Sequence, residues 1–179
     1  GNTEITIFDD GTKIREYDDS EISVSEFPES LDVKLTNHCN LGCQICHEQS
    51  TTKGVHGDLN KLLEVISCLP TGTEIANGGG DPLSHPDLIP YLTILKSRGI
   101  ISNITINQGH LKQNFDLIEH IIKEKLVHGV GISITSKNYT YISKFLDISD
   151  NIVFHVIAGV NDISILDDLI SLCDKKNKP

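Results

Sequence analysis

The sequence of 179 residues has no methionine, not even at position 1, and it has no long apolar run. A membrane-spanning helix needs about 20 consecutive apolar residues, so we expect no span here. The first residues lack the basic and apolar regions of a secretory signal peptide. The leading Gly1 suggests a processed or engineered start. Hydrophobic residues are 38% and charged residues 22%, which is typical of a globular domain with a sizeable core.

The sequence also lacks an excess of positive charge. Its formal net charge is −10 at pH 7, which argues against anionic membranes and bulk nucleic acid as partners. Cysteine is scarce, and its five copies are an odd number. Because three of them lie within eight residues, we predict free thiols in the cytoplasm and not an extracellular disulfide framework. Cys68 and Cys173 lie on expected helices, where we predict that they are buried.

The first thirty residues are predicted to be an appendage. Ile5 and Ile7 alternate with polar residues, Asp10-Gly11 is a tight-turn dipeptide, and residues 12–17 can return antiparallel. This pattern favours a β-hairpin, and an acidic connector follows it. We therefore expect two parts, the hairpin with its connector at residues 1–30 and a larger domain at residues 31–179.

From residue 31 onward, short apolar strand patterns alternate with helical stripes of apolar residues. Five strand–helix units in series predict the α/β class, with a parallel sheet whose outer face carries the helices. Continuous winding predicts a full or partial TIM-like barrel with its active site at the carboxyl ends of the strands. We expect strands at residues 31–35, 73–77, 100–107, 130–134 and 152–158, and helices at residues 59–69, 86–98, 113–125, 138–146 and 163–173.

Three cysteines in one loop are the strongest chemical signal. Cys39, Cys43 and Cys46 follow the first expected strand at the spacing C-x3-C-x2-C. Thiolates are soft ligands that suit iron–sulfur clusters, and a cube with only three of them has one iron open to another ligand. A structural zinc site with His47 as its fourth ligand is the alternative, although adjacent Cys46 and His47 would strain chelation of one ion.

The cysteine loop and the glycine-rich run after the second expected strand together resemble the radical S-adenosylmethionine (radical SAM) enzymes. In that family three cysteines bind a [4Fe–4S] cluster, and S-adenosylmethionine (SAM) chelates the fourth iron. Gly79, Gly80, Asp81 and Pro82 match the family's GGEP-like motif, with Asp in place of Glu. The resemblance implies that Cys39, Cys43 and Cys46 bind the cluster and that Gly79, Gly80 and Asp81 bind SAM.

A third segment, in the fifth expected strand, resembles the family's adenine motif GxIxGxxE. Ile157 and Gly159 match it, Asp162 matches more loosely, and His155 replaces a glycine. Ile157 would then lie against the adenine ring. The alternative is a core strand followed by a helix cap at Asp162. Three further residues are candidate cofactor contacts by position: Ile45 before the third cysteine, Asn107 at the end of the third strand, and Ser133 near the end of the fourth.

The resemblance implies a partial (β/α)6 barrel, of which five units are visible, with the sixth expected beyond residue 179. It implies reductive cleavage of SAM to a 5′-deoxyadenosyl radical, which abstracts hydrogen from a substrate. An electron donor such as flavodoxin or ferredoxin follows from this chemistry. The substrate is open between a small molecule, a nucleotide and a peptide, and no catalytic residue is assigned. A structural zinc module and a degenerate radical SAM fold that acts as a binding scaffold are the alternatives.

Overall fold

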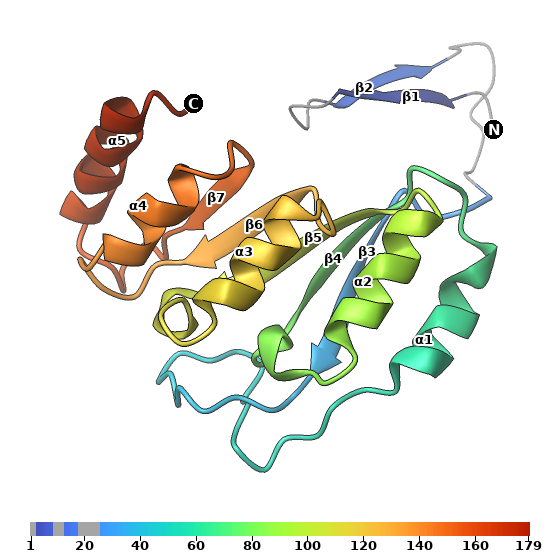
Figure 1. The fold of residues 1–179 in the computed structure, drawn as a ribbon, viewed down its shortest axis with the longest axis horizontal. Helices are drawn as coiled ribbons and strands as arrows, with labels where there is room; N and C mark the ends of the chain where they lie inside the picture. The colour runs from blue at the N-terminus through green and yellow to red at the C-terminus, as the bar shows by residue number, and fades with distance from the viewer. Residues whose placement is uncertain (1–2, 9–12, 18–25) are drawn as a thin grey trace.

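A two-stranded antiparallel hairpin and a five-stranded parallel sheet make up the strands of this computed structural model, which describes residues 3–8, 13–17 and 26–179. The two strands of the hairpin pair antiparallel, as the sequence predicts, with Ile5 opposite Arg15. The expected turn at Asp10-Gly11 falls outside the described residues. The parallel sheet has the order β3-β4-β5-β6-β7 (Figure 1). The strands are β1 (Thr3–Ile7), β2 (Lys13–Tyr17), β3 (Ser30–Thr36), β4 (Glu74–Gly79), β5 (Ile101–Asn107), β6 (Gly129–Ser133) and β7 (Ile152–His155).

Each strand of the parallel sheet is followed by a helix, so the predicted α/β class with a parallel sheet is confirmed. The helices lie on one side of this sheet (Figure 1). Within the described part of the chain, no helix combines the length and apolar character needed to cross a membrane. The helices are α1 (Leu59–Val65), α2 (Leu88–Ser97), α3 (Phe115–Lys123), α4 (Thr140–Leu146) and α5 (Ser164–Lys176), with short 3₁₀ helices η1 (Ile66–Cys68), η2 (Pro82–Ser84) and η3 (Gln108–His110).

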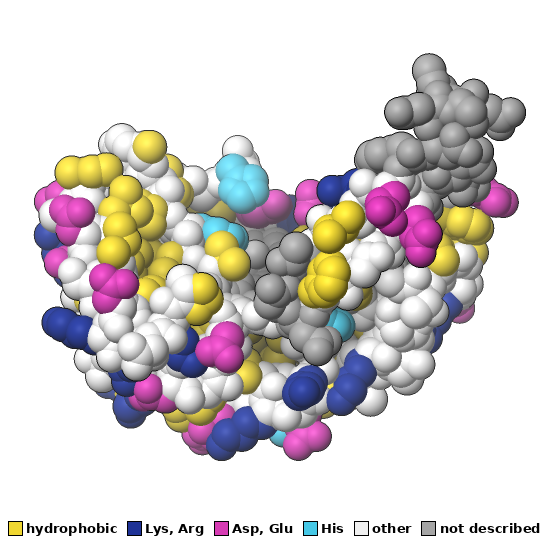
Figure 2. All heavy atoms as spheres, turned by 90° about the horizontal axis from the view of Figure 1, so that it is seen from above, with side chains coloured by type: hydrophobic (Ala, Val, Ile, Leu, Met, Phe, Trp, Pro, Cys, Tyr) yellow, Lys and Arg dark blue, Asp and Glu magenta, His cyan; other side chains and the backbone are white. Residues whose placement is uncertain are grey.

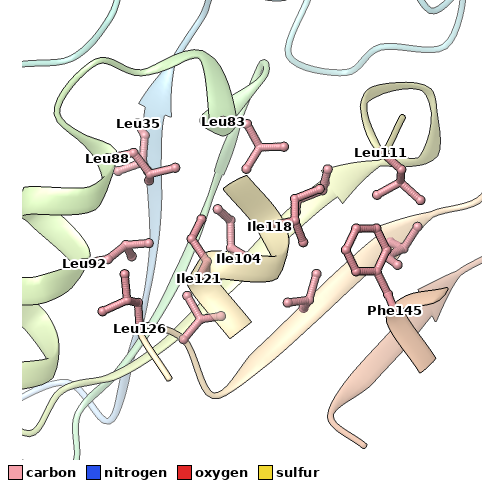
Figure 3. Close-up of a cluster of buried hydrophobic side chains, with 14 of the residues drawn as sticks. Leu35, Leu83, Leu88, Leu92, Ile104, Leu111, Ile118, Ile121, Leu126 and Phe145 are labelled. Atoms are coloured by element: carbon pink, nitrogen blue, oxygen red, sulfur yellow. The ribbon is translucent and has the colours of Figure 1, made fainter. Parts of the chain in front are cut away.

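Successive side chains of each strand point to opposite faces of the parallel sheet. One face is buried beneath the helices, and the other face is open to solvent. In β5, Ile104 and Ile106 are buried, and they pack with helix residues such as Leu92 and Ile118 (Figure 3). Parallel sheets are normally covered on both faces, so the open face is unusual. Strand periodicity directs a set of polar residues to it: Asp32, Lys34, Asn103, Thr105, Ser133 and His155.

The fifth strand of the parallel sheet is shorter than the sequence predicts. β7 ends at His155, whereas the apolar pattern favours a strand to residue 158. The Asn161 side chain accepts a hydrogen bond from Ile157 N (2.7 Å), and the Ile157 carbonyl accepts one from Asn161 N (2.9 Å). These two bonds turn the chain, so Ile157 lies in the turn after β7 and not on the strand.

Cys68 and Cys173, the two cysteines outside the C-x3-C-x2-C segment, are less buried than the sequence predicts. Cys68 ends the 3₁₀ helix η1 and is exposed, because Ile66 is the residue of that turn that faces the core. Cys173, on α5, is half-buried against the core. All five cysteines are free thiols.

A buried polar network fixes the carboxyl end of β4. The Tyr91 hydroxyl donates a hydrogen bond to Asn77 Oδ1 (3.0 Å), and Asn77 Nδ2 donates to Ser102 Oγ (2.8 Å). Burial raises the pKa of Tyr91, so the phenol is a proton donor across the whole neutral range. Because Asn77 directly precedes Gly78, this network determines where the glycine-rich loop begins.

We expect Tyr91→Phe to lower the free energy of unfolding by about 1–3 kcal/mol, because Asn77 Oδ1 then lacks its buried donor. Urea denaturation followed by circular dichroism measures this loss. Tyr139→Phe is the matched control, since that hydroxyl donates to Asp168 at an exposed position, and its effect should stay within about 0.5 kcal/mol. Equal losses in the two variants would contradict the importance of the network.

Ion pairs connect the hairpin to the parallel sheet. Lys13 Nζ on β2 lies 2.7 Å from Glu29 Oε1 and 2.9 Å from Glu74 Oε2, and Arg15 also contacts Glu29. Hydrogen bonds from Arg15 and Lys13 lower the pKa of Glu29 to about 2. Because the pKa of Glu29 is lower in the folded protein than its ordinary value of 4.5, its ionised form stabilises the fold at pH values above 4.5. This stabilisation is lost as the pH falls toward 2. Solvent screens this partly exposed cluster, so its share of stability is small.

Candidate metal centre

The cysteine loop, residues 37–57, leaves the carboxyl end of β3 and folds back on itself. Asn37 N donates to Val55 O (2.9 Å), and Cys39 N donates to Thr51 O (3.0 Å). The two arms cross so closely that a Cβ atom at Gly54 would lie 1.8 Å from Asn37 O, which excludes any other residue there. The loop is therefore a hydrogen-bonded unit that presents its three thiols at the end of β3.

The glycine-rich loop, residues 78–82, begins in the last two residues of β4 and packs against the end of β3 and the cysteine loop. Gly80 N donates to Thr36 O (2.8 Å), and Asp81 N donates to His38 O (2.7 Å). A Cβ atom at Gly79, whose φ is +109°, would lie 2.4 Å from Thr36 O, and one at Gly80 would lie 2.3 Å from His38 O. These glycines are required by the contact between the two loops, whatever ligand the site takes.

The end of β5 brings a third segment to the same place. Asn107 Nδ2 lies 3.8 Å from Cys43 Sγ, and Asn107 Oδ1 accepts a hydrogen bond from Gly109 N (2.9 Å). A Cβ atom at Gly109 would lie 2.9 Å from Leu41, so η3 packs against the cysteine loop. Asn107 is thus the candidate from β5 that the fold places beside a candidate ligand.

A buried histidine links the glycine-rich loop to the first cysteine. His110 Nδ1 lies 3.4 Å from Asp81 Oδ2, and His110 Nε2 lies 3.6 Å from Cys39 Sγ. Asp81 and His110 are 4% and 1% exposed, and Asp81 Oδ1 also accepts a hydrogen bond from Leu83 N (3.2 Å). The Asp81 carboxylate therefore has partners within the protein, and its predicted contact with SAM stays a prediction.

Burial dominates the electrostatics of these three groups. It raises the pKa of Asp81, although His110 opposes this, and it lowers the pKa of His110, although Asp81 opposes that. Burial also raises the pKa of the Cys39 thiol. The order Cys–His–Asp occurs in sites with a nucleophilic thiol, but such thiols have a lowered pKa. A metal ligand needs the same thiolate, so the raised pKa of the Cys39 thiol does not separate the two roles. Two further free thiols on the same loop favour metal ligation.

The other residues predicted to contact the cofactor are more exposed to solvent. Ile45 and Ile157 are 51% and 46% exposed, and both lie outside the strands. Ser133 ends β6 on the open face, opposite His155 in the register of β6 and β7. The His155 ring lies over Gly131, where a Cβ atom would be 2.7 Å from ring Cε1. Contacts of these residues with a cofactor stay predictions.

Two features of the site were missed by sequence reasoning. His110 has no metal-ligand spacing to other histidines, and only its position just after the third strand could have drawn attention to it. The second feature is a row of three imidazole rings, two from the cysteine loop and one from His85. The ring centroids of His38 and His56 are 5.5 Å apart, and those of His56 and His85 are 5.0 Å apart.

The three thiols of the cysteine loop are the soft donors that this site offers to a metal centre. Among residues 3–8, 13–17 and 26–179, no three His, Cys, Asp or Glu side chains are placed to hold one metal ion. A zinc ion needs its thiolates about 2.3 Å from one point, whereas a cube takes one thiolate on each iron and spreads them apart. The cysteine loop supplies three free thiols that could serve as such ligands.

Comparison with known proteins gives distant similarity. No protein-family model matches the chain. The tungsten-containing aldehyde ferredoxin oxidoreductase cofactor-modifying protein of Pyrococcus furiosus is 29% identical over 138 residues, which are 73% of this chain and 35% of that protein. A probable GTP 3′,8-cyclase of Methanothermobacter thermautotrophicus is 30% identical over 90 residues, which are 45% of this chain and 29% of that protein. The chain thus spans about a third of the length of these relatives, and it is distantly similar to enzyme-related proteins.

Proposed function

We propose that this chain is the core of a radical SAM enzyme whose [4Fe–4S] cluster is held by Cys39, Cys43 and Cys46. The observation that carries the proposal is the packing of the cysteine loop against Gly80 and Asp81, which joins the two family-like segments through backbone hydrogen bonds. When bound, the cluster supplies the electron for reductive cleavage of SAM and formation of a 5′-deoxyadenosyl radical. Distant similarity to a cofactor-modifying protein and a probable cyclase supports an enzyme of this kind.

In this proposal, residues of the chain bind the cluster and position SAM on it. The three thiolates bind three irons and leave one open for SAM. The carbonyls of Gly79 and Gly80 accept hydrogen bonds from the cofactor's ammonium group, Asn107 and Ser133 bind its polar groups, and the backbone of Ile45 binds the adenine edge. Ile157 covers the adenine ring from the turn after β7. The open polar face of the sheet is the binding surface for the substrate, which is a small molecule, a nucleotide or a peptide.

The proposal includes a partial (β/α)6 barrel, with the hairpin at residues 1–30 as an appendage. The partial barrel is supported by the surface at β7 and α5, where the hydrophobic residues Val153, Ile163 and Ile170 are exposed. Hydrophobic side chains gather at the end of the molecule where α4, α5 and β7 lie (Figure 2). A sixth β/α unit would pair with β7 and bury these residues. Flavodoxin or ferredoxin is the proposed electron donor.

Anaerobic reconstitution with iron and sulfide tests the proposal on the unaltered protein. We expect four irons and four sulfides per chain, an EPR signal of a reduced [4Fe–4S] cluster that changes when SAM is added, and formation of 5′-deoxyadenosine with a chemical reductant. Zinc without iron or sulfide in anaerobically purified protein would instead support the structural zinc module. A cluster that binds SAM but never yields 5′-deoxyadenosine would support the binding scaffold.

A further inference from the structure

We propose that His110 is a positioning residue that donates a hydrogen bond from Nε2–H to the sulfur of Cys39 and thereby raises the reduction potential of the cluster; this inference rests on the proposed function. The distance of 3.6 Å between these atoms is a normal N–H···S contact. His110 is 1% exposed and Cys39 is partly buried, so water does not compete strongly for the bond. A protein's levers on such a cluster include hydrogen bonds to its sulfurs.

The direction of the hydrogen bond follows from the ligand. A metal-bound thiolate has no proton and can only accept, so the imidazole must donate from Nε2. The opposite ring nitrogen, Nδ1, lies 3.4 Å from Asp81 Oδ2 and 3.2 Å from the Gln113 side-chain amide. With Nε2–H donating to the sulfur, the neutral ring accepts at Nδ1 from the Gln113 side-chain amide, and this bond fixes the ring plane that aims Nε2 at the sulfur.

The fold rigidly fixes the three groups relative to one another. Asp81 is tied to the cysteine loop by its backbone N–H, which donates to His38 O (2.7 Å). His110 is in η3 at the end of β5, and β4 and β5 are hydrogen-bonded neighbours in the sheet. Asp81 is the residue that departs from the family's glutamate, and its shorter side chain reaches His110 and the Leu83 N–H together. The Asp81 carboxyl group is thereby fixed beside the His110 ring.

The consequence is a cluster that is easier to reduce. Adding an electron increases the negative charge on the ligand sulfurs, so a hydrogen bond to Cys39 is stronger in the reduced state than in the oxidised state. Removing it in His110→Phe should lower the equilibrium constant for reduction about tenfold, which corresponds to about 59 mV for a one-electron couple. His110→Gln keeps an N–H donor near the same place and should recover part of the change.

An EPR-monitored redox titration of the reconstituted cluster at fixed pH tests this. We expect a lower potential in His110→Phe, a partial recovery in His110→Gln, and no change in the matched variant His120→Phe, because His120 is exposed on α3. An unchanged potential in His110→Phe with a normal cluster content would overturn the inference and leave the proposed function intact. An unaltered protein that forms no reducible cluster would overturn the proposed function, and the inference would fall with it.

A second measurement needs no variant at the buried position. In unaltered protein grown with ¹⁵N-labelled histidine, pulsed EPR of the reduced cluster should detect a histidine nitrogen coupled through the hydrogen bond. The coupling should persist in His38→Asn, because the His38 ring Nδ1 contacts Ser84 Oγ (3.3 Å) and not a cysteine sulfur. Absence of the coupling, or its loss in His38→Asn, would overturn the assignment to His110.

Discussion

Cys43→Ala is expected to abolish cluster assembly and to reduce 5′-deoxyadenosine formation to the level found without protein. Cys43 is exposed in the cysteine loop, and its sulfur lies 3.8 Å from the side-chain amide nitrogen of Asn107. Loss of one of three thiolates leaves two irons of a cube without a protein ligand, and such a cluster does not persist. Because the side chain is outside the core, the fold itself should be unaffected.

Cys68→Ala is the matched control for that experiment. Cys68 is also an exposed free thiol, but it lies at the end of η1, where its sulfur donates to Val65 O (3.6 Å). Iron and sulfide content, the EPR signal and 5′-deoxyadenosine formation should all equal those of the unaltered protein. Retention of SAM cleavage in Cys43→Ala would refute the proposed cluster, and equal losses in both variants would point to general thiol damage.

Gly80→Ala is expected to lower the free energy of unfolding by about 3 kcal/mol, because it overpacks the contact between the two loops. The added Cβ atom would lie 2.3 Å from His38 O, a backbone atom that cannot move without displacing the residue next to Cys39. The hydrogen bond from Asp81 N to His38 O would break with it. Affinity for SAM should fall as well, since the same displacement separates the cluster ligands from the glycine-rich loop.

Gly78→Ala provides a control with the same chemical change two residues away. A Cβ atom at Gly78 meets no atom within 4 Å, and the backbone there is not in the left-handed region. Its effect on stability should stay within about 1 kcal/mol. Urea denaturation of both variants and isothermal titration with SAM measure the two effects. If Gly78→Ala were as damaging as Gly80→Ala, the contact between the loops would not be the cause.

Sequence periodicity was sufficient to predict the order of strands and helices, because each element buries one stripe of apolar residues. The prediction failed where a local polar contact competes with that pattern. At Ile157 the apolar alternation continues, but the Asn161 side chain binds the Ile157 N–H and turns the chain. At Cys68 the helical stripe continues into a 3₁₀ turn, whose tighter winding rotates the thiol out to solvent.

The candidate site could be predicted in part for a similar reason. Cysteine spacing and glycine runs are local patterns, and parallel strands bring their carboxyl ends to one edge of the sheet. The packing of the cysteine loop against Gly80 and Asp81 therefore followed from the sequence. The contact between His110 and Cys39 joins residues 71 positions apart and depends on how η3 packs beneath the cysteine loop. No spacing rule describes such a contact, and only the folded chain reveals it.

The order of the parallel sheet has a consequence for how the chain folds during synthesis. Each strand from β3 to β6 pairs with the next strand in the chain, so each pairing closes a loop that contains a single α-helix. Each pairing therefore costs only a modest loop-closure entropy. The sheet can begin to form as soon as β4 is available to pair with β3. On the ribosome, the cysteine loop can form its contacts with Gly80 and Asp81 while β6 and β7 are still being translated.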